Sequence, residues 1–233
     1  MVMREEEKQA TMSKKISFQS VLDKHKGREF LVCCPGKNII EWKERVSSFA
    51  LENELMVIGL NKVPDIIVPN YHLFTNNDKY EHYGDNTGSS TVLLGSGIRK
   101  EWILKHSPRE YVLVKYNDRN KNEPDKYNSN KDVIEGYYRT SGNLAIMVSH
   151  LMGASVVYIA GMCGFTFQFD GTVHYYKAEI GRDVKSKKEW HRKYDNPVGR
   201  SLDNLKAYGI KFKIITPTIY EKHFDGEVLS CDA

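Results

Sequence analysis

The sequence has few cysteines and no long apolar segment. The four cysteines are Cys33, Cys34, Cys163 and Cys231, and none of them belongs to a C-x-x-C pair. This spacing argues against a disulfide framework and against a zinc site, and it is typical of buried, reduced thiols. No apolar run reaches the roughly 18 residues that cross a bilayer, and residues 1–15 lack the apolar core of a signal peptide. We therefore expect a cytoplasmic protein without a transmembrane segment.

Several catalytic motifs are also absent. The sequence contains no G-x-G-x-x-G or Walker loop, no G-x-S-x-G elbow, no H-E-x-x-H pair and no D-x-D pair after a predicted strand. Without a D-x-D pair we expect no bound metal. The 34 basic and 30 acidic residues give a net charge of only +4. A nucleic-acid-binding protein usually has a clustered basic surface, so we expect no nucleic-acid partner.

Apolar runs alternate with helical patterns along most of the chain. We expect strands at residues 29–34, 55–60, 65–69, 111–116, 154–162 and 211–217, and a strand followed by a turn within residues 91–98. We expect helices at residues 38–53, 140–153 and 201–210. Continuous apolar strands that alternate with helices indicate a mainly parallel sheet buried on both faces. The prediction is an α/β protein with one Rossmann-like domain over residues 28–233, preceded by a disordered or peripheral leader at residues 1–27.

Three polar stretches are expected to be loops. Residues 70–90 are rich in Asn, Tyr and Gly, residues 117–132 have no periodicity, and residues 163–200 are aromatic and basic. A structureless loop of about 15 residues is long for a compact domain and often has a function. We therefore expect segments 117–132 and 165–200 to be loops or lids near the substrate.

Candidate ligand residues follow the predicted strands, because ligands of open α/β sheets bind at the carboxyl ends of the strands. The turn Pro35-Gly36-Lys37 leads from a strand into a helix, where backbone N–H groups suit a phosphate. Asn61 and Asn70 follow the next two predicted strands, and their side-chain amides suit a base edge or a sugar hydroxyl. A plain strand-to-helix turn and turn-forming asparagines would give the same pattern.

The helix at 140–153 opens with Arg139-Thr140-Ser141-Gly142. Hydroxyl groups and free N–H groups at a helix N-terminus form an anion site. Arg139 would add a fixed positive charge with bidentate reach. A plain helix cap at Thr140 or Ser141 is the alternative.

Further candidates follow the most apolar strand. Gly161 and Cys163 lie in a turn whose glycines allow a ligand to approach the backbone. His174, Tyr175 and Tyr176 then offer polar aromatic groups. Histidine is the commonest general base near neutral pH, and we take His191 as the first candidate and His174 as the second.

These segments resemble the central part of the CMP-dependent bacterial sialyltransferases of glycosyltransferase family 42. The features that match are the run Arg139-Thr140-Ser141-Gly142, an apolar helix ending at Met152-Gly153, and the strand and turn VVYIAGMCGF. The order of the other elements agrees, and the resemblance covers about residues 28–217. The same layout occurs in proteins of related fold that are linked to pterins.

The resemblance implies a GT-A-like variant of the Rossmann fold that binds a CMP-activated, sialic-acid-like sugar without a metal or a cofactor. By this resemblance Arg139 and Ser141 would contact the donor phosphate or nucleotide. Asn61 and Asn70 would hold the ribose, base or sugar. The aromatic hydroxyls of residues 174–176 would stabilise the departing phosphate. The partners would be the nucleotide-sugar donor and a glycan acceptor, with homo-oligomerisation left open.

Two positions depart from the family's pattern. Its first asparagine corresponds to Cys33, and its histidine base corresponds to Val198. Two alternatives to glycosyl transfer therefore stay open. The scaffold would suit pyrophosphoryl transfer, as in the pterin-linked proteins, or a non-catalytic nucleotide-sugar-binding protein, which Val198 favours.

Overall fold

A parallel sheet with helices on both faces forms the centre of the protein. The computed structural model describes residues 13–63, 65–121, 123–176 and 188–230. Within these residues the large sheet has the order β1-β6-β5-β4-β3-β2-β10-β11, and all neighbouring strands are parallel. Its strands are β1 (Lys14–Ser17), β2 (Glu29–Cys33), β3 (Met56–Leu60), β4 (Tyr71–Phe74), β5 (Thr91–Gly95), β6 (Glu110–Val114), β10 (Val156–Ala160) and β11 (Phe212–Ile214).

Strand β2 shows why these strands are apolar at nearly every position. Phe30 and Val32 point into the core that α4 (Ser141–Leu151) and α5 (Lys188–Ala207) cover. Leu31 and Cys33 point the other way, into the core that α1 (Ile39–Glu52) covers. A strand with helices on both faces has no solvent side, so alternation of polar and apolar residues disappears. The predicted α/β class is confirmed.

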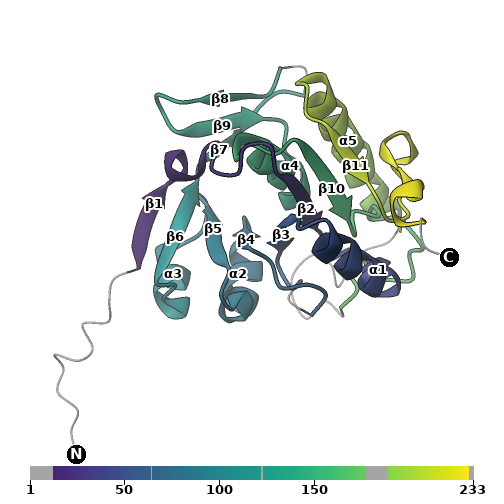
Figure 1. Ribbon diagram of the computed structural model, residues 1–233, viewed down its shortest axis with the longest axis horizontal. Coiled ribbons are helices and arrows are strands. Elements are labelled where there is room, and N and C mark those ends of the chain that lie inside the picture. Colours follow the sequence, from purple (N-terminus) through teal and green to yellow (C-terminus); the bar gives the residue numbers. More distant parts are fainter. Residues whose placement is uncertain (1–12, 64, 122, 177–187, 231–233) are drawn as a thin grey trace, which may run out of the picture.

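The remaining elements extend this layered arrangement. Helices α2 (Asn77–Tyr83) and α3 (Lys100–His106) pack with β4, β5 and β6 around a third, aromatic core. A small sheet has the order β7-β9-β8, from β7 (Tyr116–Asp118), β9 (Val133–Gly136) and β8 (Lys126–Asn128). In Figure 1, α1, α2 and α3 lie along the lower side, and the small sheet and α5 lie along the upper side. Short 3-10 turns complete the structure: η2 (Phe18–Val21), η3 (Gly84–Thr87), η5 (Glu221–His223) and η6 (Gly226–Leu229).

The predicted strand at 65–69 and the predicted loop at 70–90 are wrong. The fourth strand of the chain is β4, and α2 and η3 follow it inside the stretch expected to be a loop. Residues 65–69 leave Val68 67% exposed, and Pro69 lacks the N–H that a central strand needs. Helix α2 begins where the Asn76 side chain accepts a hydrogen bond from the Lys79 N–H, 3.2 Å away.

The two expected lid segments contain regular structure. Segment 117–132 includes the end of β7 and all of β8. Within segment 165–200, residues 177–187 lie outside the described residues, and residues 188–200 form the first part of α5. The predicted helix at 201–210 is therefore only the end of a longer helix. Its pattern was hidden because Pro197 interrupts it and because His191 and Asp195, both polar, share its buried face with Val198.

The predicted leader also ends too late. Strand β1 pairs with β6 at the edge of the sheet. Phe18 and Val21 are buried in the core that α4 covers. Residues 14–27 therefore belong to the domain, because the edge strand and these two side chains complete its core, whereas residues 1–12 lie outside the described part of the chain.

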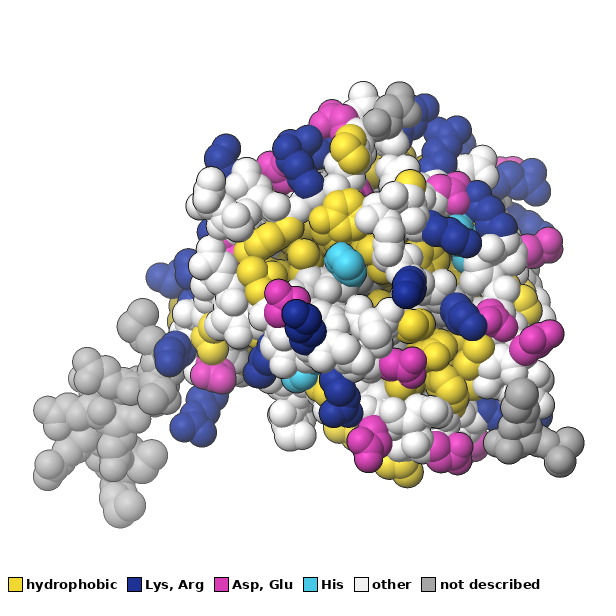
Figure 2. Space-filling model, turned by 45° about the horizontal axis from the view of Figure 1, so that its top comes forward, with side chains coloured by type: hydrophobic (Ala, Val, Ile, Leu, Met, Phe, Trp, Pro, Cys, Tyr) yellow, Lys and Arg dark blue, Asp and Glu magenta, His cyan; other side chains and the backbone are white. Residues whose placement is uncertain are grey.

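Charged side chains of both signs lie on the face shown in Figure 2. They are mixed around its rim, and hydrophobic side chains gather nearer the middle. In the described part of the chain, no helix has the length and apolarity to cross a membrane.

Candidate functional site

A cavity of about 240 Å³ lies at the carboxyl ends of β2, β3 and β10. Residues that directly follow these strands form nearly half of its wall, namely Cys34–Gly36, Asn61 and Gly161–Phe165. The chain runs outward from β2 through β3, β4, β5 and β6, whereas β10 lies on the other side of β2. The strand order therefore reverses between β2 and β10, which is where open α/β sheets bind their ligands.

Two glycines make part of the cavity lining from backbone atoms, because neither position has room for a side chain of its own. Gly161 has a φ of +73°, which favours glycine, and a Cβ there would lie 2.0 Å from the Cys34 carbonyl oxygen. A Cβ at Gly36 would lie 2.0 Å from the Gly161 carbonyl oxygen. The turns after β2 and β10 therefore touch, and a ligand in the cavity meets both of them.

Helix α4 points its N-terminus at the cavity. The Thr140 hydroxyl caps the helix by accepting from the Asn143 N–H at 3.2 Å. Ser141 and Gly142 line the cavity, and their N–H groups have no acceptor within the helix. The helix dipole and these donors favour a negatively charged group at this wall.

Asn61 supplies an acceptor on another wall. It has a left-handed backbone, with a φ of +54°. The ring of His72 holds this turn, since its Nε2 donates to the Asn61 carbonyl at 2.5 Å. Burial lowers the pKa of His72 to about 4, so the ring is neutral at pH 7. Among the described residues, the buried Asn61 Oδ1 has no hydrogen-bond partner, which leaves it available to a ligand donor.

The segment Phe165–Tyr176 brings a histidine to the cavity. His174 lines the wall and forms a bridge with Gly36. Lys37 holds the same segment, with its Nζ 2.6 Å from the Asp170 carboxylate and 2.7 Å from the Gln168 carbonyl. The hydrogen bond from Lys37, followed by those from Thr172, lowers the pKa of Asp170 to about 2. His174 is thus positioned by contacts on both sides of the turn after β2.

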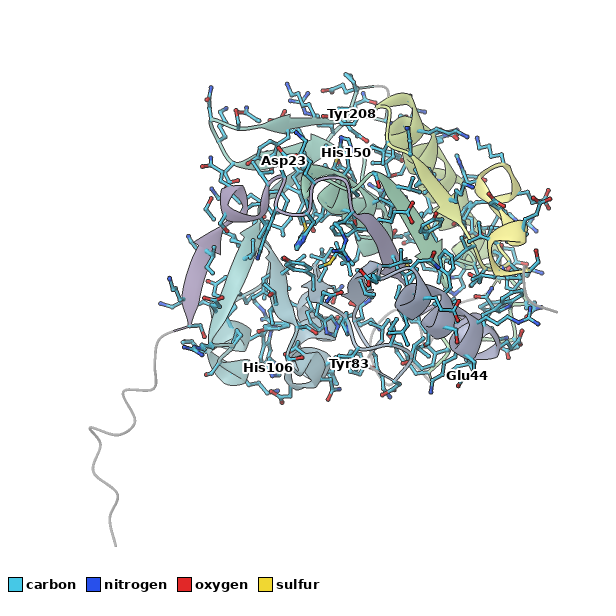
Figure 3. The ribbon with its side chains drawn as sticks, viewed as in Figure 1. Asp23, Glu44, Tyr83, His106, His150 and Tyr208 are labelled. Atoms are coloured by element: carbon cyan, nitrogen blue, oxygen red, sulfur yellow. The ribbon has the colours of Figure 1, made fainter. Side chains whose placement is uncertain are left out.

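The other described histidines are not among the residues that line the cavity. Figure 3 labels His106 near the lower edge of the molecule and His150 near its upper edge. His106 Nδ1 lies 2.7 Å from the Asp85 carboxylate, and the ring of His150 packs edge-on against Tyr208 at 5.7 Å. These two rings are therefore placed for structural contacts rather than for chemistry in the cavity.

The two thiols of the cavity lining and the Asp195 carboxylate, which contacts the lining residue Phe165, do not suit nucleophilic or acid–base roles. Burial raises the pKa of Cys34 and of Cys163, so both thiols are protonated at neutral pH. The Asp195 carboxylate accepts hydrogen bonds from the Phe165 N–H at 2.7 Å and from the Thr166 hydroxyl at 2.6 Å. Within the described residues, no cluster of three His, Cys, Asp or Glu side chains is arranged to hold a metal ion.

Nine of the residues predicted for the site do line the cavity. They come from five separate segments that the fold brings together: Pro35, Gly36, Asn61, Thr140, Ser141, Gly142, Gly161, Cys163 and His174.

Two of the remaining predicted residues have structural partners elsewhere. Arg139 pairs with Asp118 at 2.7 Å instead of pointing into the cavity. Asn70 precedes β4, and its Oδ1 accepts from the Val57 N–H at 2.8 Å. Because β4 begins after Asn70, this residue lies at the amino ends of the strands, on the opposite edge from Asn61, and its predicted place beside the ligand is wrong.

The other four predicted residues are not in the cavity lining. Lys37 makes the contacts described above. The Tyr175 hydroxyl donates to the Lys62 carbonyl, and the Tyr176 ring stacks on His174 at 5.1 Å. His191 is 1% exposed between the rings of Phe165 and Phe169, so the first-ranked base of the sequence prediction is not in the cavity lining.

Sequence reasoning missed more of the lining residues than it found. Asn76 and Lys79 follow β4, and the misplaced fourth strand concealed them. Val198 is 2% exposed and lines the cavity from α5, at the position where the family resemblance expects a histidine. Other lining residues that were not chosen as candidates are apolar or aromatic, and include Leu60, Met162, Phe165, Val173 and Tyr220.

Comparison with known proteins adds one informative likeness. No family model and no curated protein matches the sequence. Among solved structures, the fold resembles the MAf glycosyltransferase from Magnetospirillum magneticum AMB-1, with a TM-score of 0.55 and 10% sequence identity. The match covers 90% of this chain and 35% of that one, so this chain spans about a third of that protein's length. The likeness shows a Rossmann-like α/β fold shared with a glycosyltransferase, while the resemblance to family 42 in particular remains a prediction.

Proposed function

We propose that this chain binds a nucleotide-activated sugar in the cavity and transfers the sugar to a hydroxyl group of an acceptor. The main support is the position of the cavity at the reversal between β2 and β10, with the N-terminus of α4 in its wall. The fold likeness to the MAf glycosyltransferase agrees with this proposal. The cavity combines an anion-binding end with apolar side chains, as a nucleotide-sugar requires.

The donor would lie with its phosphate against Ser141 and Gly142. From there, the apolar wall formed by Leu60, Met162 and Val198 would cover the base or the sugar. The Asn61 Oδ1 would accept a hydrogen bond from an amino or hydroxyl group of the donor. We propose a CMP-linked donor because the helix start Arg139–Gly142 resembles that of the CMP-dependent enzymes, and because one helix N-terminus suits one phosphate group without a metal.

His174 is the base that the geometry favours. In the proposed reaction, its imidazole takes the proton from the acceptor hydroxyl as that oxygen attacks the anomeric carbon. The bond from the anomeric carbon to the phosphate oxygen breaks, and the nucleoside phosphate leaves with the electron pair. The N–H groups at the start of α4 would stabilise the negative charge that develops on the leaving phosphate. Contacts around Gly36 and Lys37 hold His174 in place.

A second candidate is a nucleotide-binding protein without transferase activity. The observation that favours it is Val198, an apolar side chain in the cavity wall where the resemblance places a histidine base. This candidate keeps the same ligand site and differs only in turnover. Ligand binding and sugar transfer therefore have to be measured separately.

The experiment that tests both candidates is a thermal-shift screen followed by a turnover assay. The ligands are CMP, CDP, UDP, GDP, ATP and their sugar conjugates, each with and without magnesium. A ligand at 100 times its Kd adds about 2.7 kcal/mol to the free energy of unfolding. We expect a magnesium-independent shift with CMP or a CMP-sugar that Ser141→Ala reduces. Ser149→Ala is the matched control, because Ser149 lies in the same helix and donates to the Ala145 carbonyl.

Each outcome of the screen has a distinct meaning. Binding of a CMP-sugar with release of CMP supports the transferase. Binding with no turnover of the sugar for any acceptor tested supports the non-catalytic candidate. A shift with magnesium and ATP alone would overturn the proposal in favour of pyrophosphoryl transfer.

A further inference from the structure

An aromatic surface borders the cavity on the side of α5. The Phe165 ring lines the cavity and stacks on the His191 ring, with the two centres 6.0 Å apart. The Phe169 ring contacts the same histidine at 5.1 Å, and the Tyr194 ring packs against Phe165 at 6.0 Å. His191 is buried, whereas the other three residues are partly exposed to solvent. We call Phe165, Phe169 and Tyr194 the aromatic rim.

The backbone beneath the rim is held at both ends. The buried Asp195 carboxylate accepts hydrogen bonds from the N–H groups of Phe165, at 2.7 Å, and of Thr166, at 3.1 Å. Further along the segment, the Lys37 Nζ donates to the Gln168 carbonyl at 2.7 Å. A surface that is already fixed before a ligand arrives loses little conformational entropy on binding. These contacts therefore preorganise the rim as a binding surface.

The rim is continuous with the cavity. Phe165 belongs to both, and the segment that carries Phe165 also brings His174 into the cavity lining. Phe169 belongs to none of the three hydrophobic cores of the described residues. Neither Phe169 nor Tyr194 is in the cavity lining, so a donor held in the cavity leaves both rings available to a second molecule. A molecule bound on the rim would extend directly to the cavity.

The chemistry of the rim fits a sugar ring. One face of a pyranose carries C–H groups, which pack on the negative face of an aromatic ring, while its hydroxyl groups lie around the edge. Gln168, Arg192 and Lys193 are exposed and adjoin rim residues in the sequence. A lipid chain favours a continuous apolar surface, which these polar side chains interrupt. A sugar ring has the same mixture of an apolar face and a polar edge.

We propose that the aromatic rim is the acceptor subsite, on which a sugar ring of the acceptor stacks. The inference rests on the proposed function for the statement that this sugar is the acceptor. The subsite itself requires only that the rim binds a neutral sugar. Phe169 and Tyr194 would supply ring faces to the acceptor, and Phe165 would lie between acceptor and donor.

The test is saturation-transfer NMR on the full chain, with and without CMP. The probes are the methyl α- and β-glycosides of glucose, galactose, mannose and N-acetylglucosamine. The aromatic protons of the protein are irradiated, so that saturation passes to sugar C–H groups that lie close to aromatic rings. We expect at least one glycoside to receive saturation, mainly on the protons of one face of its ring.

Substitutions in the rim separate ring stacking from apolar packing in general. Phe169→Tyr keeps the ring and should bind the glycoside as the wild type does. Phe169→Leu and Tyr194→Leu keep an apolar side chain without a ring, and each should weaken binding about fivefold. Tyr208→Leu is the matched control, because Tyr208 is 38% exposed, directly follows α5 and is not in the cavity lining. The affinity for CMP should be the same in all four variants.

Several results would overturn the inference. One is that no glycoside receives saturation from the wild-type protein. Another is that Phe169→Leu binds as tightly as Phe169→Tyr, because the aromatic ring is then not needed. A third is that Tyr208→Leu weakens glycoside binding as much as the rim variants do. If the rim variants instead lose binding to a serine-rich peptide or to phosphatidylcholine vesicles and bind glycosides unchanged, the rim serves a protein or a lipid and the inference fails.

The same titrations separate this inference from the proposed function. If CMP binds and no glycoside does, the acceptor subsite is wrong and the nucleotide site stands. If glycosides bind at the rim but no nucleotide or nucleotide-sugar shifts the unfolding transition, the proposed transferase is wrong and the rim remains a sugar-binding surface.

Discussion

His72 links the acid stability of the protein to the shape of its cavity. The ring is 0% exposed in β4 and donates to the Asn61 carbonyl at the cavity wall. Its pKa is lowered from the usual 6.5 to about 4 because burial penalises the charged form, an effect that the hydrogen bond to Asn61 partly opposes. The folded protein therefore keeps His72 neutral at pH values where the unfolded chain already binds a proton.

The sign and size of the effect follow from this difference in pKa. Stability falls as the pH drops through 6.5, because only the unfolded state takes up the proton, and the loss is complete once the pH falls below about 4. Each pKa unit corresponds to about 1.4 kcal/mol. The free energy of unfolding should therefore fall by about 2 kcal/mol between pH 7 and pH 5, and by about 3 kcal/mol by pH 4, from His72 alone.

The assay is urea unfolding of the wild type and of His72→Gln at several pH values from 7 to 4. Glutamine does not titrate, and its amide is able to donate to the Asn61 carbonyl. His25, His150 and His223, whose pKa values burial also lowers, are present in both proteins and cancel in the comparison. At pH 7 the wild type should be more stable, and its advantage should shrink by about 2 kcal/mol at pH 5. Two curves that stay parallel across this range would refute the reasoning.

Three shorter predictions concern other residues of the site. Arg139→Ala should keep the thermal shift with CMP, because Arg139 pairs with Asp118 outside the cavity, and loss of the shift would contradict this placement. His174→Phe should keep the ring stacking on Tyr176 and should still bind the nucleotide, but it should lower the rate of sugar transfer by 10²-fold or more. His191→Phe should transfer the sugar at the wild-type rate. The reverse pattern in a turnover assay would restore His191 as the base. Gly161→Ala should prevent folding or cost about 4 kcal/mol or more in urea unfolding, because of the positive φ and the contact with Cys34, and a near-wild-type midpoint would contradict the packing.

The sequence allowed the class of fold to be predicted because buried strands leave a plain signal. Strands β2, β3 and β10 are continuous apolar runs, and their predicted ranges agree with the structure. Strand β4 gave no such signal, since the buried polar ring of His72 interrupts it and the neighbouring run at 65–69 is more apolar. Helix α5 was concealed in the same way by Pro197 and by the buried polar groups of His191 and Asp195.

The candidate site was predictable where it depends on strand ends and helix starts. Gly36, Asn61, Ser141 and Gly161 were found because each follows a strand or opens a helix that the pattern already located. The choice of His174 over His191 depends on the contact that brings the 165–176 segment, and His174 with it, back to Gly36. That contact joins distant parts of the chain, and a local pattern does not contain it.

The strand order also has a consequence for the way the protein folds. Cys33 lies opposite Ala160 in the neighbouring strand, although the chain forms all the elements from α1 to α4 between them. Strands β2 to β6 pair in sequence order, so this half can assemble through contacts between successive elements as the chain is synthesised. Strand β10 pairs with β2 across the longest stretch of chain between any two paired strands of the sheet, so we expect its side of the cavity to close late. A ligand that contacts the walls from both sides of β2 would therefore stabilise the folded state more than the transition state for folding. It would slow unfolding more than it speeds folding.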